Sequence, residues 1–213
     1  MKKFFSLCLS LCIATLFALP ASAQEKLVLD MSDGSQHIGY NRSAVYSTME
    51  YVDMSSEPMG KTTRYPIKNI ERMTFIKENG QKTKFVKEYF YRLVKGDKKR
   101  YNKHHPIILR TEYEGKDITL YSELKKREET RGLMTTTIQE RWYYVKFDGE
   151  KAAHPIGGEV LDGNRHNDKS VFRIFSRRAF EDYPELVRRI NNNEFSIKNP
   201  IALIKAYERL KGY

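Results

Sequence analysis

Cysteine is scarce in this chain. Its two cysteines, Cys8 and Cys12, both lie within the first 23 residues, which we expect to be removed. The rest of the chain then has no thiol, and this excludes disulfide bonds and Cys-based zinc or redox sites. Residues 24–213 are nonetheless numerous enough to bury a hydrophobic core without such cross-links.

The chain also lacks a hydrophobic run long enough to cross a bilayer. Residues 4–19 carry no charge, but this segment is shorter than the ~20 residues of a membrane-spanning helix. It follows the cationic pair Lys2 and Lys3 and precedes an A-x-A cleavage pattern that ends at Ala23. We therefore expect residues 1–23 to be a signal peptide cleaved between Ala23 and Gln24. The mature chain should be periplasmic or secreted, without a transmembrane span.

Catalytic motifs are absent as well. The sequence has no Gly-x-Ser-x-Gly elbow, phosphate loop, dinucleotide fingerprint or His-Glu-x-x-His helix. It therefore indicates no catalytic residue, no metal site and no cofactor. A pair of carboxylates of the glycosidase type stays open as an alternative, because folding and not spacing brings such residues together.

The histidines and one polar loop are the weak metal candidates. His104 and His105 are adjacent, so in an extended segment their side chains point to opposite faces, and we interpret them as part of an exposed turn. His37 and His154 stand singly and are interpreted as surface or packing residues. Residues 162–168 resemble a calcium loop but lack its glycine and its final acidic residue, which favours an Asx-rich turn.

Residues 24–156 show the two-residue alternation of β-strands, broken by turns such as Asp33-Gly34 and Asp148-Gly149. A series of hairpins without intervening helices predicts an antiparallel β-meander or half-barrel. Both faces of residues 141–147, which include Trp142, carry large side chains. That pattern predicts a strand covered on both sides.

The period changes to that of helices in residues 157–213. Asp182 is predicted to cap a helix that buries Leu186, Val187 and Ile190, and a last helix follows Asn199-Pro200. We expect about three helices packed on the sheet. The predicted fold class is α+β, with residues 24–156 and 157–213 in one structural unit.

Positive charge is concentrated in one segment. Removal of Lys2 and Lys3 lowers the net charge from +11 to +9, and residues 82–105 alone carry nine basic and two acidic residues. Aromatic and basic residues alternate there, which predicts a hairpin with its exposed tip at residues 96–103. The candidate anion-binding residues are Lys95, Lys98, Lys99, Arg100 and Lys103. The alternative is a solvated hairpin whose lysines discourage edge pairing.

Several short motifs are shared with a known group of proteins. They are Asp33-Gly34 before Gly39-Tyr40, Tyr65-Pro66-Ile67, the stretch from Gly115 to Tyr121, and Tyr183-Pro184-Glu185-Leu186. On these motifs the chain resembles a family of uncharacterised exported proteins of Bacteroidetes-type bacteria. The resemblance implies a β-meander followed by short helices, and it implies no catalytic residues.

Taken together, these features predict an exported, envelope-associated binding or accessory protein without a catalytic site. Its expected partners are an anionic lipid, lipopolysaccharide, an acidic glycan or another envelope protein, and not nucleic acid. One alternative is a periplasmic hydrolase with a carboxylate-based site. Another is a subunit held by partners through its sheet edges, which would expose a contiguous apolar patch.

Overall fold

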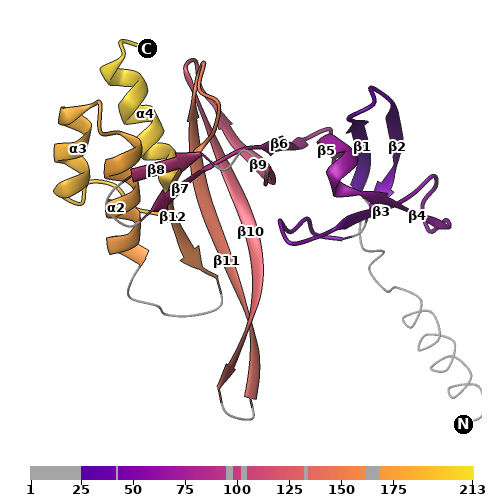
Figure 1. Ribbon diagram of the computed structural model, residues 1–213. Helices are drawn as coiled ribbons and strands as arrows, with labels where there is room; N and C mark the ends of the chain where they lie inside the picture. Colours follow the sequence, from indigo (N-terminus) through magenta and orange to yellow (C-terminus); the bar gives the residue numbers. More distant parts are fainter. Residues whose placement is uncertain (1–24, 42, 95–97, 102–104, 132–133, 162–167) are drawn as a thin grey trace, which may run out of the picture.

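The protein folds into an antiparallel β-sheet with helices at one end (Figure 1). Its structure is a computed structural model that describes residues 25–41, 43–94, 98–101, 105–131, 134–161 and 168–213, without the side chains of residues 93, 94, 98–101, 131 and 168. The strands are β1 (Glu25–Met31), β2 (Gln36–Asn41), β3 (Tyr51–Ser55), β4 (Thr62–Pro66), β5 (Ile70–Ile76), β6 (Lys82–Glu88), β7 (Tyr91–Val94), β8 (Lys98–Tyr101), β9 (Ile107–Glu114), β10 (Ile118–Arg131), β11 (Met134–Phe147) and β12 (His154–Val160). The helices are the 3-10 helix η1 (Ile67–Asn69) and the α-helices α2 (Asp168–Ala179), α3 (Pro184–Asn191) and α4 (Pro200–Leu210). The fold is therefore α+β, as predicted.

Ten of these strands form one sheet in the order β12-β11-β10-β9-β6-β5-β1-β2-β3-β4. The order departs from a simple meander because β5 returns to pair with β1. Leu27 of β1, Val52 of β3 and Phe75 of β5 are buried in one cluster, which shows that the N-terminal strands curl around a core of their own. This half-barrel lies at the opposite end of the sheet from the helices (Figure 1).

The helices form a second core on one face of the C-terminal strands. Leu186 and Ile190 of α3 and Leu203 of α4 pack there with Leu120 and Val145 of the sheet. The burial predicted for Leu186 and Ile190 is thus confirmed. β12 continues to Val160, past the boundary expected after residue 156.

The predicted cap of the helix that contains Leu186 was wrong. Tyr183, and not Asp182, is the residue before the first turn of α3, and no side chain caps that turn. Pro184 occupies the first turn, where the missing N–H costs nothing. In α2 the sheet contact is made by Phe172 and Ser176, which are buried, whereas Ile174 is 46% exposed.

The opposite face of the sheet is also covered. Tyr144 of β11 is buried beside Phe90, with ring centroids 6.0 Å apart, while its neighbour Tyr143 belongs to the helix-side core. Trp142 lies edge to face against Phe175 of α2 at 5.7 Å. Both faces of β11 therefore carry packed side chains, as the sequence predicted.

The basic segment differs from its prediction. β6 ends at Glu88 and belongs to the large sheet, and β7 and β8 form a separate two-stranded sheet. Lys98 and Arg100 are paired with Val94 and Arg92 within that hairpin. Lys98–Tyr101 is thus a strand, where the prediction placed a turn, and the predicted exposure of residues 96–103 stays a prediction.

Candidate functional site

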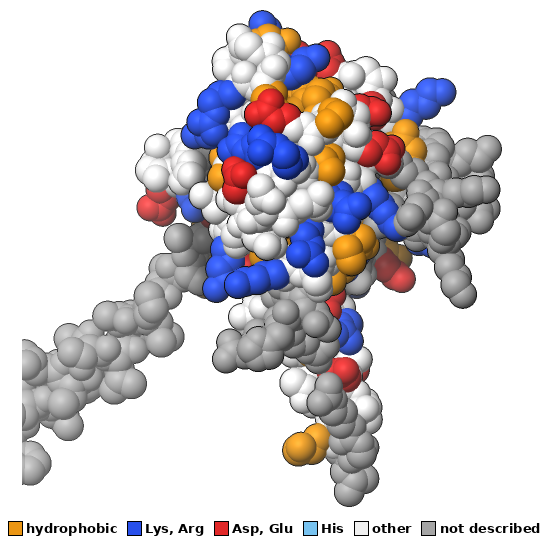
Figure 2. Space-filling view, turned by 90° about the vertical axis from the view of Figure 1, so that its left-hand side faces the viewer, with side chains coloured by type: hydrophobic (Ala, Val, Ile, Leu, Met, Phe, Trp, Pro, Cys, Tyr) orange, Lys and Arg blue, Asp and Glu red, His pale blue; other side chains and the backbone are white. Residues whose placement is uncertain are grey.

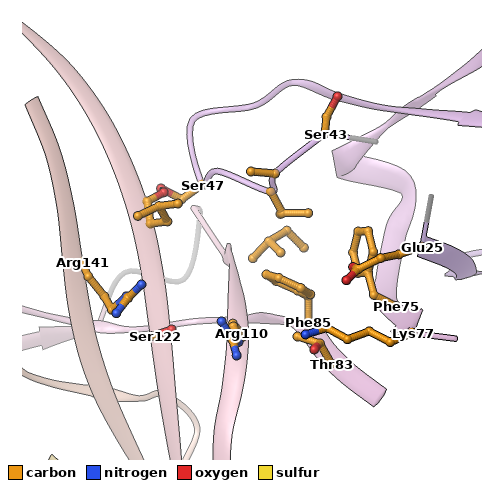
Figure 3. Close-up of a pocket in the computed structure, with 14 residues that line it drawn as sticks. Glu25, Ser43, Ser47, Phe75, Lys77, Thr83, Phe85, Arg110, Ser122 and Arg141 are labelled. Atoms are coloured by element: carbon orange, nitrogen blue, oxygen red, sulfur yellow. The ribbon is translucent and has the colours of Figure 1, made fainter. Parts of the chain in front are cut away.

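A pocket of about 240 Å³ lies where the half-barrel meets the C-terminal strands (Figure 3). β1, β5, β6, β9, β10 and β11 contribute to it, together with the loop between β2 and β3. Its lining residues are Glu25, Ser43, Ala44, Val45, Ser47, Phe75, Lys77, Thr83, Phe85, Ile108, Arg110, Ser122, Leu124 and Arg141. Pockets at such junctions are common ligand sites.

The register of the strands builds this lining in two rows. Phe85, Arg110 and Ser122 are direct cross-strand neighbours on β6, β9 and β10. The next row joins Leu124 of β10 to Arg141 of β11. Because alternate residues of a strand share a face, apolar and cationic side chains two positions apart enter the same pocket.

The apolar part of the pocket is aromatic and aliphatic. Phe75 and Phe85 meet edge to face, with ring centroids 5.5 Å apart, and Ile108 is buried beside them in the half-barrel core. Val45 packs against the same core from the loop. This wall offers an apolar surface that water solvates poorly.

Three cations surround that wall. Arg141 enters from one side and Lys77 from the other, with Arg110 and Phe85 between them (Figure 3). Glu25 is the one carboxylate among the lining residues. The lining therefore carries a net positive charge that favours anions.

These cations are weakly held by the protein itself. Arg110 Nε lies 3.5 Å from Glu112 Oε1, and Arg141 Nη1 lies 3.8 Å from Glu159 Oε1. Among the described residues, Lys77 has no ion pair. Partly exposed pairs of this length contribute about 0–1 kcal/mol, so an anion can compete for these groups.

Ser122 adds a hydroxyl to the same surface. It is buried and donates a hydrogen bond of 2.5 Å to Glu112 Oε1. The buried hydroxyl therefore has a hydrogen-bond acceptor, and the carboxylate has a donor. This pair is the one arrangement at the pocket that resembles a nucleophile beside a proton acceptor.

The loop between β2 and β3 passes over the pocket and is attached to β10. The Ser47 backbone N–H donates to the Leu124 carbonyl at 3.1 Å. Lys126 Nζ lies 4.1 Å from the centre of the Tyr46 ring, a cation–π contact. Residues 43–47, which we call the strap, therefore link the half-barrel to the long hairpin of β10 and β11.

The predicted site residues do not meet at this pocket. Lys95, Lys103, Ala23 and Gln24 lie outside the described residues, as do residues 162–167 of the calcium-like loop. Lys98, Lys99 and Arg100 are placed in β8, and their side chains are not described. The anion-binding role of these basic residues stays a prediction.

The two described histidines with ring contacts have structural partners. His37 packs on Tyr65, with ring centroids 4.8 Å apart. His154 is buried beside Tyr91, and its Nε2 lies 2.6 Å from Glu150 Oε2. Within the part of the chain that the structure covers, no group of three or more His, Cys, Asp or Glu could hold a metal ion.

Among the described acidic side chains, the most buried one lies on the other face of the sheet. Glu123 is 3% exposed. It accepts a hydrogen bond from the Tyr144 hydroxyl at 2.5 Å and forms an ion pair with Lys125, whose Nζ lies 2.9 Å from Glu123 Oε2. Burial and the Glu123 charge raise the pKa of Tyr144 well above its usual range. These paired groups serve the packing of the sheet and leave no free carboxylate there.

No protein family, curated protein or solved structure matches this chain. Among the described residues, no helix is long and apolar enough to span a membrane. The pocket and its charges therefore carry the functional argument.

The sequence analysis missed all three pocket cations. Lys77, Arg110 and Arg141 are far apart in the chain, and none belongs to the basic segment. The available signal was an apolar residue followed two positions later by a cation, as in Phe75 with Lys77 and Ile108 with Arg110.

Proposed function

We propose that this protein is a non-catalytic binding protein of the cell envelope, whose ligand is a small anion with a short apolar tail. The observation that carries the proposal is the convergence of Lys77, Arg110 and Arg141 on one aromatic pocket. The apolar tail would contact Phe75 and Phe85, and the anionic group would form ion pairs with the weakly paired cations.

The size of the pocket narrows the ligand class. Its volume of about 240 Å³ is below the roughly 300–1,000 Å³ of sites for drug-sized molecules. A medium-chain fatty acid or a single acyl tail of a larger anionic molecule fits this limit better than an entire phospholipid. Export, expected from the N-terminal segment, would place such a protein among envelope lipids and glycans.

Isothermal titration calorimetry with three probes tests the proposal. Octanoate has both the anion and the tail, octanol has only the tail, and acetate has only the anion. We expect octanoate to bind more tightly than the other two. Binding of octanol as strong as that of octanoate would contradict a role for the cations.

Matched variants assign the binding to the pocket. Arg110→Gln removes a charged hydrogen-bond donor, which should weaken octanoate binding roughly tenfold, and Arg110→Lys should have a smaller effect. Lys26→Gln is the control, because Lys26 is exposed and does not line the pocket. Equal affinities of Arg110→Gln and Lys26→Gln would refute the site.

A hydrolase is the second candidate, and the Ser122–Glu112 hydrogen bond is the observation that favours it. In that case the protein would hydrolyse p-nitrophenyl octanoate, and Ser122→Ala would abolish the release of p-nitrophenol. We favour binding, because Ser122 is buried and its carboxylate partner also faces Arg110. Turnover that depends on Ser122 would replace the binding proposal.

A further inference from the structure

Helix α2 presents a well-defined outward side. Phe172, Ser176 and Ala179 are buried, and the Ser176 hydroxyl donates to the Ile156 carbonyl of β12 at 3.1 Å. With 100° between successive residues of a helix, Ile174 points away from that contact. It is 46% exposed.

Cations flank this exposed isoleucine. Arg173 and Arg177 lie on one side of it and Arg178 on the other, and Lys169 extends the row by one turn. Within the described part of the chain, Lys169, Arg173 and Arg177 have no ion pair. Many basic residues of the sheet are paired with carboxylates instead; among them are Lys84, Lys87, Arg127 and Lys146.

A shallow groove continues the apolar surface from α2 to α3. It has a volume of about 630 Å³ and is lined by Ile174, Arg177, Arg178, Glu181, Pro184 and Val187. Figure 2 looks onto the helical end of the molecule, where apolar and basic side chains lie next to one another. Glu181 is the one carboxylate that lines the groove.

We infer that this surface, which we call the α2 face, docks on an anionic phospholipid bilayer. The face combines the two features that such a surface recognises, namely cations for the headgroup phosphates and an apolar centre for the acyl boundary. A purely anionic glycan would use the cations but gains little from Ile174 and Val187. The inference does not depend on the pocket, which shares no lining residue with this groove.

Vesicle co-sedimentation tests the α2 face. The probes are vesicles of 30% phosphatidylglycerol in phosphatidylcholine, and pure phosphatidylcholine vesicles, at low and physiological salt. We expect binding to the anionic vesicles that weakens with salt, because exposed charges are screened over about 8 Å at physiological ionic strength. Absence of binding to anionic vesicles at low salt would overturn the inference.

Charge-matched triple variants locate the surface. Lys169→Gln with Arg173→Gln and Arg177→Gln should weaken binding roughly a hundredfold, and glutamine preserves the helix. The control substitutes glutamine for Lys26, Lys61 and Lys82, which are exposed, lie in or beside β1, β4 and β6, and do not line the groove. It should change affinity no more than about threefold.

Two outcomes would contradict the α2 face. One is an equal loss in the α2 variant and the control, which would show attraction by net charge alone. The other is a loss confined to a variant of Lys98, Lys99 and Arg100, which would assign membrane contact to the β7–β8 hairpin. Circular dichroism of each variant confirms that the fold is retained.

Discussion

Replacement of Leu186 by alanine should destabilise the protein by about 2–5 kcal/mol. Leu186 is fully buried between α3, α4 and the sheet. The side chains around it come from the helices and the ten-stranded sheet, so the space that the substitution leaves is filled only in part. The lost apolar contacts and the residual cavity both contribute to the cost.

Urea unfolding, followed by far-UV circular dichroism and by fluorescence of the single tryptophan, measures this loss. Trp142 touches Phe175 of α2, so its emission reports on the contact between sheet and helices. Leu210→Ala is the matched control, because Leu210 is 38% exposed, and it should cost less than about 1 kcal/mol. A loss below about 0.5 kcal/mol for Leu186→Ala would show that the helices are not part of the core.

Three further predictions concern the face of the sheet that carries Trp142, Tyr144 and Tyr121. A Cβ at Gly158 would lie 2.7 Å from the Trp142 ring, so Gly158→Ala should cost about 1–3 kcal/mol, measured as a lower Tm. Tyr144→Phe leaves the buried Glu123 without one hydrogen-bond donor and should cost about 1–3 kcal/mol in urea unfolding. Burial raises the pKa of Tyr121 to about 12, whereas an unfolded tyrosine titrates near 10. The contribution of Tyr121 to the free energy of unfolding should therefore be level below pH 10 and fall from pH 10 towards 12; equal free energies of unfolding at pH 9 and 11 would contradict this.

The elements of this fold could be predicted because their signals are local. Alternation at Leu27 and Leu29 and the turn at Gly34 define β1 and its hairpin, and the spacing of Leu186 and Ile190 defines α3. The return of β5 to β1 could not be predicted, because it rests on contacts between distant residues such as Leu27 and Phe75. Hydrophobic alternation identifies a strand but not its partner.

The basic hairpin shows the same limit. The alternation around Tyr89 predicted one continuous hairpin, yet the chain leaves the large sheet after Glu88. The Ala153 backbone exchanges hydrogen bonds with Tyr89 and Tyr91 instead. This contact with Ala153, which is distant in the sequence, separates β6 in the large sheet from β7 in the two-stranded sheet. The pocket could not be predicted for a related reason. Arg110 and Arg141 reach one surface only through the pairing register of β9, β10 and β11.

The central claim is that the pocket between the half-barrel and the C-terminal strands binds an anion with an apolar tail. A ligand of about ten heavy atoms at about 0.3–0.6 kcal/mol per atom has a Kd of roughly 0.05–5 mM, which suits an NMR titration with octanoate. We predict saturable shifts of the Val45 and Ile108 methyl groups and the Arg110 side chain, with Ile174 unchanged. Saturable chemical shift changes centred outside the pocket would contradict the account. So would the absence of any change at 20 mM octanoate, which is about four times the weakest expected Kd.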